Sequence, residues 1–230
     1  MKKILPCVIG LGYVGLPIFL RLQKKFQCKG YDINKKRVDE LNLKKDKNRE
    51  FSKKELYLKN KSLFTTDLKK IKECNFYIIT VPTPIYQNNK PNLEPLIKST
   101  KMISKFIKKD DIIYIESTVY PGVTLKLGKI LQKRNNMIIN KDFWIGYSPE
   151  RINPGDKHKT VDKIKKIVSF ENCPQIIRNK ILSVYKSISK NLVLSSSIKE
   201  AEMSKVIENI QRDINIAFMN EIMMISEKLN

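Results

Sequence analysis

The sequence contains 230 residues, of which 41% are hydrophobic and 30% are charged. This composition is typical of a globular protein with one large domain, or with one domain and the start of another. The formal net charge is +22, but 38 of the 45 basic residues are lysines, and no aromatic pattern is interleaved with them. We therefore expect no specific nucleic-acid binding. No run of 18 or more apolar residues occurs, so we expect no membrane-spanning segment and no membrane partner.

The N-terminal segment combines lysines with an apolar run, as a signal peptide does, but glycines interrupt that run. A nucleotide-binding loop explains these glycines better, so we expect a cytoplasmic protein without a signal peptide. The cysteines at 7, 28, 74 and 173 show neither CxxC pairing nor metal-site spacing. We expect no metal site, and we interpret the first three cysteines as small core residues.

Apolar runs that predict strands alternate with amphipathic runs that predict helices. In chain order we expect a strand at 4–10, a helix at 14–25, a strand at 28–32, a helix at 34–43, strands at 63–66 and 76–81, a helix at 93–109, a strand at 111–117, a helix near 122–134 and a strand at 143–148. The charged stretch 44–61 is expected to be a surface helix or loop. This alternation predicts right-handed crossovers and a mostly parallel sheet, which is a Rossmann-like, doubly wound α/β fold.

A smaller tail follows, with a helix expected near 174–188 and a strand at 191–195. The last segment reads as one long helix that starts after Ser197, because Glu200 follows three residues later in a capping-box pattern. Its apolar positions recur at helical spacing to the final residues, which carry no glycine, proline or other C-cap signal. We therefore expect the chain to stop inside a longer helix that bridges domains or forms a dimer interface.

The first chemical motif is G-x-G-x-x-G, which follows the first strand and opens the first helix. It consists of Gly10, Gly12 and Gly15, with Tyr13 and Val14 between them. Asp32 ends the second strand, where a carboxylate accepts hydrogen bonds from a ribose 2′-hydroxyl and repels a 2′-phosphate. The pattern therefore predicts NAD as the cofactor, in preference to NADP.

Three further motifs leave the carboxyl ends of later strands, where doubly wound folds bind their ligands. "TVPTP" (80–84) contains Thr83, "ESTVYPG" (116–122) places Thr118 over the cofactor crevice, and "GYSPERINPGDKHK" (146–159) carries Glu150 and Arg151. Prolines shape these segments as rigid turns. The alternative interpretation of "TVPTP" is a simple strand terminator, and we interpret His158 as an ordinary surface residue.

On the long helix, Lys205, Asn209 and Arg212 share one face, because they are spaced by four and three residues. This face lies roughly opposite an apolar stripe that passes through Ile207 and Ile210. Taken by itself, the spacing favours an ordinary solvated helix face.

Taken together, the motifs resemble those of the UDP-glucose/GDP-mannose dehydrogenase family. The resemblance covers essentially the whole chain and rests on "GLGYVGLP", "VPTP", "ESTVYPG", "YSPERINPGDK" and "AEMSKVIENIQRDINIAFMNE", in that order. The forms "YSPERINPGDK" and "KVIENIQRDINIA" are most similar to the branch that oxidises UDP-N-acetylhexosamines, of the Vi-polysaccharide type. The resemblance implies a two-step oxidation of a sugar C6 alcohol to a carboxylate with two NAD⁺, for surface polysaccharide synthesis.

The resemblance also implies roles for individual residues. Thr118 and Glu150 would position the hydrolytic water and assist proton transfer, while Lys205 and Asn209 would stabilise the oxyanion and orient the reacting carbon. The implied cofactor contacts are Gly10, Gly12, Tyr13, Val14, Gly15, Asp32, Thr83 and Thr118. The implied substrate contacts are Glu150, Arg151, Ile152, Asn153, Lys205, Asn209 and Arg212.

The sequence departs from the family in one respect. The family captures the aldehyde with a cysteine thiolate in a glycine-rich motif, and none of the four cysteines lies in such a motif. We therefore expect residues 1–196 to form the NAD-binding domain and 197–230 to begin a central dimerisation domain, with the UDP-binding domain absent. We expect a homodimer for the full-length family, or here a partner chain that carries the missing half.

Two other functions remain open from the sequence. One is a non-catalytic module that binds NAD or a partner chain. The other is a one-step, NAD-linked dehydrogenase of related fold, such as a hydroxyacid type, which would need no cysteine. In the leading interpretation, the 230-residue chain by itself does not complete the oxidation to the acid.

Overall fold

The computed structural model describes residues 3–150 and 165–229. The elements follow one another as β1 (Pro6–Ile9), α1 (Gly15–Leu22), β2 (Lys29–Tyr31), α2 (Lys35–Asn42), β3 (Leu63–Thr65), the 3₁₀ helix η1 (Leu68–Ile71), β4 (Phe76–Ile79), α3 (Glu94–Ile103), β5 (Ile112–Ile115), α4 (Val123–Asn135), β6 (Trp144–Tyr147), β7 (Lys166–Phe170), α5 (Gln175–Ile188), β8 (Leu192–Leu194) and α6 (Ile198–Lys228).

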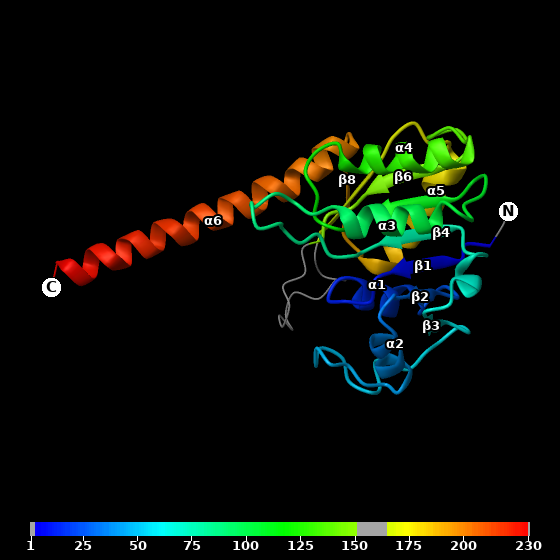
Figure 1. Ribbon diagram of the computed structural model, residues 1–230, viewed down its shortest axis with the longest axis horizontal. Helices are drawn as coiled ribbons and strands as arrows, with labels where there is room; N and C mark the ends of the chain where they lie inside the picture. Colours follow the sequence, from blue (N-terminus) through cyan, green and yellow to red (C-terminus); the bar gives the residue numbers. More distant parts are fainter. Residues whose placement is uncertain (1–2, 151–164, 230) are drawn as a thin grey trace.

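The described strands form one sheet in the order β3-β2-β1-β4-β5-β6-β7-β8. All neighbouring pairs are parallel except β6 and β7, which are antiparallel. The strand order reverses between β1 and β4, as in a doubly wound fold. The predicted fold class is therefore confirmed, with helices on both faces of a mostly parallel sheet (Figure 1).

The register of the parallel strands aligns their carboxyl ends. Ile9 lies opposite both Tyr31 and Ile79, Ile79 lies opposite Ile115, and Ile115 lies opposite Tyr147. These residues are the last of β1, β2, β4, β5 and β6. The loop after each of these strands therefore starts at the same edge of the sheet, which is where the described parts of the predicted strand-end motifs begin.

Two apolar cores cover the two faces of the sheet. One contains α1 and α5 with buried side chains such as Phe19 and Ile181, and the other contains α3 and α4 with side chains such as Leu96 and Leu127. The central strands β1, β4, β5 and β6 are buried along their whole length. This explains why they read as continuous apolar runs rather than as alternating ones.

The structure differs from the expected elements in two respects, and it decides between the alternatives left open at 44–61. β7 was not predicted, because its five residues follow a lysine-rich stretch and contain no long apolar run. The expected strands and the helix at 93–109 extended beyond their observed ends. The stretch 44–61 takes the loop alternative: Asp46 accepts hydrogen bonds from the backbone nitrogens of Asn48, Glu50 and Phe51, which satisfies backbone donors without a helix.

Helix α6 begins where the capping pattern places it, although only half of the capping box forms. The Ser197 side chain accepts a hydrogen bond from the Glu200 nitrogen at 3.1 Å, while the Glu200 carboxylate turns to the Ser196 nitrogen at 2.8 Å. The helix then projects away from the sheet (Figure 1). Among its described residues only Ile198, Ala201 and Glu202 are buried. No described helix combines the length and hydropathy needed to cross a membrane.

Candidate active site

The glycine motif forms a tight turn between β1 and α1. Gly10 has φ +94°, in the left-handed region that favours glycine, and its nitrogen donates to the Tyr31 oxygen at 2.8 Å. A Cβ on Gly15 would lie 1.9 Å from the Gly10 oxygen, so the start of α1 packs directly on the turn. At Gly12 a Cβ would meet no atom within 4 Å. Gly12 therefore leaves space on the open side of the loop.

This geometry fits a dinucleotide. A pyrophosphate needs close backbone approach and the positive end of a helix dipole, and the open side of Gly12 lies at the N-terminus of α1. Thr80 at the end of β4 fixes the loop, since its hydroxyl lies 3.0 Å from the Ile9 oxygen and 2.8 Å from the Gly10 oxygen. Tyr13 is exposed and Val14 is the N-cap residue of α1, so both lie beside this space.

Asp32 stands at the end of β2, as the sequence predicts. One carboxylate oxygen accepts a hydrogen bond from the Leu11 nitrogen at 2.8 Å, and the other accepts one from the Asn34 nitrogen at 2.8 Å. Each carboxylate oxygen has a second lone-pair site, so both can still accept a ribose hydroxyl. The nitrogen of Leu11, within the glycine loop, thus helps to hold the Asp32 carboxylate at the end of β2.

Sequence reasoning missed Arg37, which holds the carbonyl group of Leu11, the residue whose nitrogen donates to Asp32. Its Nε donates to the Leu11 oxygen at 2.9 Å, and one terminal nitrogen pairs with Asp46 at 2.7 Å. The other terminal nitrogen, Nη2, is buried without a hydrogen-bond partner among the described residues. The available signal was an arginine in the first turn of the helix that follows Asp32.

The turns after β4 and β5 are joined by side-chain hydrogen bonds. The Thr83 hydroxyl donates to the backbone oxygen of Thr118 at 2.9 Å, and the Ser117 hydroxyl donates to the backbone oxygen of Val81 at 2.6 Å. Thr118 is exposed while Ser117 is buried. The two predicted residues Thr83 and Thr118 therefore lie together at the carboxyl edge of the sheet, next to the glycine loop.

Glu150 follows β6 and is only 8% exposed. Its carboxylate accepts a hydrogen bond from Lys166 Nζ at 2.7 Å, and the same Nζ lies 2.5 Å from a carboxylate oxygen of Glu116, the residue after β5. The other Glu116 oxygen accepts a hydrogen bond from the Tyr185 hydroxyl at 2.8 Å. Sequence reasoning identified Glu150 but not Glu116, Lys166 or Tyr185, which are separated from one another along the chain.

The charges in this buried group influence one another. Burial raises the pKa of Glu116 to about 7, although the attraction of Lys166 acts in the opposite direction. Burial alone would lower the pKa of Lys166, but the carboxylates of Glu116 and Glu150 outweigh it and raise that pKa. The lysine therefore remains an ammonium group at neutral pH.

Helix α6 is tied to the site by Glu202, a residue that sequence reasoning also missed. The Glu202 side chain is fully buried and accepts hydrogen bonds from the Gly122 nitrogen at 2.5 Å and the Thr124 nitrogen at 2.8 Å. A carboxylate from one helix therefore caps the N-terminus of another, α4. Lys205 follows one turn later and is half-buried, and Asn209 follows after another turn and is exposed.

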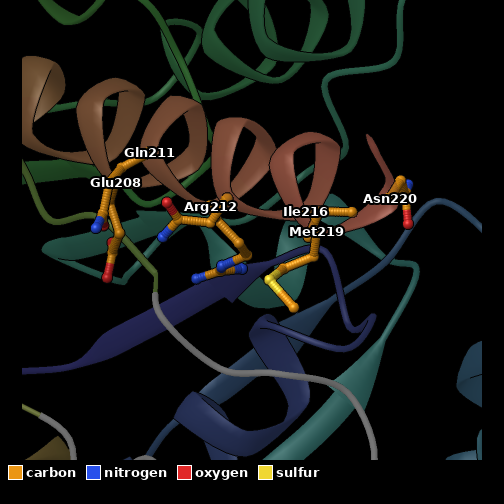
Figure 2. Close-up of a pocket in the computed structure, with 7 residues that line it drawn as sticks. Glu208, Gln211, Arg212, Ile216, Met219 and Asn220 are labelled. Atoms are coloured by element: carbon orange, nitrogen blue, oxygen red, sulfur yellow. The ribbon is translucent and has the colours of Figure 1, made fainter. Parts of the chain in front are cut away.

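Arg212 lies further out along α6. It lines a hollow together with Glu208, Gln211, Asn215, Ile216, Met219 and Asn220, all from the same helix. Figure 2 shows Arg212 between Glu208 and Met219 on this side of the helix. Of the described predicted residues, Lys205, Asn209 and Arg212 therefore lie on α6 and not in the turns that follow the strands. Arg151, Ile152 and Asn153 lie outside the described residues.

The four cysteines do not supply a nucleophile at this edge. Cys7, Cys28 and Cys74 are buried, and burial raises the pKa of the Cys7 and Cys28 thiols well above the ordinary value. Cys173 follows β7, which runs antiparallel to β6 and leads away from the carboxyl edge, and burial raises its thiol pKa as well. The expectation of core roles for the first three is confirmed.

Comparison with known proteins identifies the family. Residues 3–189 match the NAD binding domain of the UDP-glucose/GDP-mannose dehydrogenase family, and residues 199–230 match the central domain of that family. The chain belongs to this family. The expectation of an NAD-binding domain of this family is therefore confirmed.

The curated relatives include two UDP-N-acetyl-D-glucosamine 6-dehydrogenases. The protein from Salmonella typhi is 48% identical over 97% of this chain, and the one from Pseudomonas aeruginosa is 44% identical over the whole chain. These matches cover 52% and 54% of the relatives' lengths, so this dehydrogenase-family chain spans about half the length of the curated relatives it matches.

Solved structures show the same fold. The UDP-N-acetyl-mannosamine dehydrogenase Cap5O from Staphylococcus aureus aligns with a TM-score of 0.83 and 26% identity, over 98% of this chain and 55% of that one. A 3-hydroxyisobutyrate dehydrogenase from Mycobacterium tuberculosis aligns with a TM-score of 0.67 at 10% identity, over 99% of this chain and 66% of that one. This second likeness concerns the fold alone.

Proposed function

We propose that the chain is the NAD-binding part of a UDP-N-acetylhexosamine 6-dehydrogenase, which oxidises the sugar C6 alcohol to the uronate for surface polysaccharide synthesis. One observation carries this proposal: the dinucleotide loop, Thr118 and Glu150 all lie at one sheet edge in a chain that is 48% identical to a UDP-N-acetyl-D-glucosamine 6-dehydrogenase.

The residues of this chain have separate tasks in the proposed reaction. The glycine turn and Asp32 would hold NAD⁺, which would supply the hydride acceptor for the oxidation. Thr83 contacts the cofactor from the neighbouring turn. Thr118 orients the hydrolytic water at the exposed end of β5, and Glu150 takes up protons as the C6 alcohol is oxidised and as water hydrolyses the thioester.

Helix α6 supplies positive and polar groups to the same reaction. Lys205 and Asn209 donate hydrogen bonds to the oxygen on C6 as negative charge develops there. Arg151, Ile152, Asn153 and Arg212 contact the substrate. In balance, one primary alcohol, two NAD⁺ and one water give one carboxylate, two NADH and three protons.

The proposed reaction also requires a thiolate from outside these 230 residues. Each of the four cysteines lacks either exposure or an activating environment, and a nucleophilic cysteine needs both. A partner polypeptide that carries a cysteine and the remaining UDP contacts, or a homodimer of a longer chain, would complete the site.

The cofactor part is tested by titrating the purified chain with NAD⁺ and NADP⁺ and comparing Gly12→Ala with Gly15→Ala. We expect NAD⁺ to bind more tightly than NADP⁺, because Asp32 repels a 2′-phosphate. Gly12→Ala should keep the melting temperature and lose at least about tenfold in NAD⁺ affinity, which equals ~1.4 kcal/mol, because its methyl group enters open space at the pyrophosphate position.

Gly15→Ala is the contrasting variant. Its Cβ would lie 1.9 Å from the Gly10 oxygen, so it should lower the melting temperature whether or not nucleotide is present. Equal NAD⁺ affinity in wild-type chain and Gly12→Ala, with both folded, would contradict the cofactor assignment.

The substrate part is tested by incubating the chain with NAD⁺ and UDP-N-acetylglucosamine, with and without a cysteine-bearing C-terminal polypeptide from a relative. We expect uronate and two NADH for each sugar only in the combined sample. Uronate formation by the 230-residue chain alone would contradict the need for an external thiolate. In a separate incubation with NAD⁺ and a small hydroxyacid, without the added polypeptide, formation of one NADH for each hydroxyacid would instead indicate the one-step dehydrogenase.

A further inference from the structure

Lys166 is a buried ammonium group that the proposed reaction does not use. It is the first residue of β7 and is 3% exposed. Its Nζ donates to Glu116 at 2.5 Å and to Glu150 at 2.7 Å, and it lies 3.4 Å from the Pro149 oxygen. Removing a charge from water costs several kcal/mol unless partners compensate it. The three contacts supply that compensation.

The lysine is held from the interior of the protein by groups other than Glu150. The carboxylate of Glu116 accepts hydrogen bonds from Lys166 and from the Tyr185 hydroxyl on α5. The Tyr185 ring packs against the Tyr114 ring with a centroid distance of 4.7 Å, and the Tyr114 hydroxyl donates to the Ser169 oxygen on β7 at 2.9 Å. These contacts join β5, β7 and α5 around the lysine, so contacts other than the one with Glu150 hold it in position.

The antiparallel direction of β7 brings Lys166 to the site. Because β7 runs opposite to β6, its first residue lies at the carboxyl edge, beside the loop that contains Glu150. The Ser148 hydroxyl ties the same loop to the Ile167 oxygen at 2.6 Å. Glu150 is thus held next to a fixed positive charge at the edge of the sheet.

We propose that Lys166 is a positioning residue for Glu150: the buried ammonium, fixed by Glu116 and Tyr185, keeps the Glu150 carboxylate ionised and aimed at the strand-end site. The proposal deepens the proposed function, in which Glu150 takes up protons, and it rests on that function. It concerns the charge state of Glu150, which can be measured without substrate or nucleotide.

The test follows the charge state of Glu150 by ¹³C NMR of the 230-residue chain labelled at the glutamate carboxyl carbons. The Glu150 signal is identified by its absence in Glu150→Gln. Four variants are compared with wild type: Lys166→Met, Lys166→Arg, Lys166→Met with Glu116→Gln, and Lys165→Met. Lys165 is the exposed neighbouring lysine, so Lys165→Met is the matched control.

The double variant separates the loss of Lys166 from a change in the charge of Glu116. Because burial raises the pKa of Glu116 to about 7, Glu116 is mostly protonated near pH ~6, and Glu116→Gln keeps that neutral state. We expect the protonated fraction of Glu150 near pH ~6 to rise at least about tenfold in Lys166→Met alone and in the double variant, because each removes the charge that faces Glu150. Wild type, Lys165→Met and Lys166→Arg should show an ionised Glu150.

Two results would overturn the proposal. One is an unchanged Glu150 signal in a folded Lys166→Met/Glu116→Gln chain. The other is unfolding of both methionine variants while Lys166→Arg stays folded, which would assign Lys166 to the fold alone. Failure of the proposed function would look different, since a chain that binds no NAD⁺ or forms no uronate can still show the expected change at Glu150.

Discussion

Glu116 shows how burial changes the chemistry of a single residue. It directly follows β5 and is 1% exposed, and burial raises its pKa from the ordinary 4.5 to about 7. The folded chain therefore keeps the proton of Glu116 at pH values where the unfolded chain has already released it. This difference stabilises the fold at low pH, and the contribution disappears as the pH rises through about 7.

We predict that Glu116→Gln removes a pH-dependent part of the stability. A pKa raised from 4.5 to about 7 corresponds to about 3 kcal/mol at ~1.36 kcal/mol per unit. The free energy of unfolding of wild type should thus fall, relative to Glu116→Gln, between pH ~4.5 and ~7. Urea unfolding of both chains over this range measures the difference. Glu73→Gln, an exposed glutamate, is the control and should follow wild type.

At the scale of elements, the contact between α6 and α4 depends on one buried carboxylate. Glu202 caps the N-terminus of α4 through the nitrogens of Gly122 and Thr124, only a few residues after Thr118. Because Lys205 lies one turn further along α6, this cap sets where Lys205 stands relative to the turn that carries Thr118. Residues 201–205 therefore link helix capping to the candidate site.

We predict that Glu202→Gln destabilises the chain by about 1–3 kcal/mol, since an amide retains one acceptor and loses the charge that favours the helix N-terminus. Guanidinium unfolding measures this change. Glu221→Gln lies on the exposed part of the same helix and should leave stability unchanged within about 0.5 kcal/mol. Equal stability of the Glu202 and Glu221 variants would show that the cap contributes nothing measurable.

At the scale of the whole molecule, most apolar side chains of the sheet domain are buried, whereas most of those on α6 are exposed. The helix projects from the domain (Figure 1), and Ile207, Ile214 and Phe218 are 58%, 62% and 61% exposed. Apolar surface of this extent on one element marks an interaction site or favours aggregation. The rest of the described chain does not cover this surface.

We predict concentration-dependent association of the chain through α6. Ile214 and Phe218 are four residues apart and share a face, so Ile214→Glu with Phe218→Glu should shift the chain toward monomer. Sedimentation velocity over a range of concentrations measures this change. Ile138→Glu changes an apolar residue that is 50% exposed elsewhere, and it should leave association unchanged. A wild-type chain that is monomeric at every concentration would contradict the prediction.

The sequence by itself determined the fold class, the glycine turn and the order of the strand-end motifs. It did so because these features are local: a buried strand reads as an apolar run, and a glycine is required where φ is +94° at Gly10 or where Gly15 meets the Gly10 oxygen. Asp32, Thr83, Thr118 and Glu150 were found for the same reason, since each directly follows a strand or lies in a proline-shaped turn. Their roles remain predictions.

Only the tertiary structure decided which distant residues meet. Glu116, Glu150, Lys166 and Tyr185 come from four parts of the chain, and no local spacing connects them. Glu202 looks like any polar residue of an amphipathic helix until α6 packs against α4. Strand β7 was missed because its place is set by pairing with β6 and β8 rather than by its own pattern. Charge pairs and sheet edges depend on contacts between segments far apart in sequence, and these contacts exist only once the chain has folded.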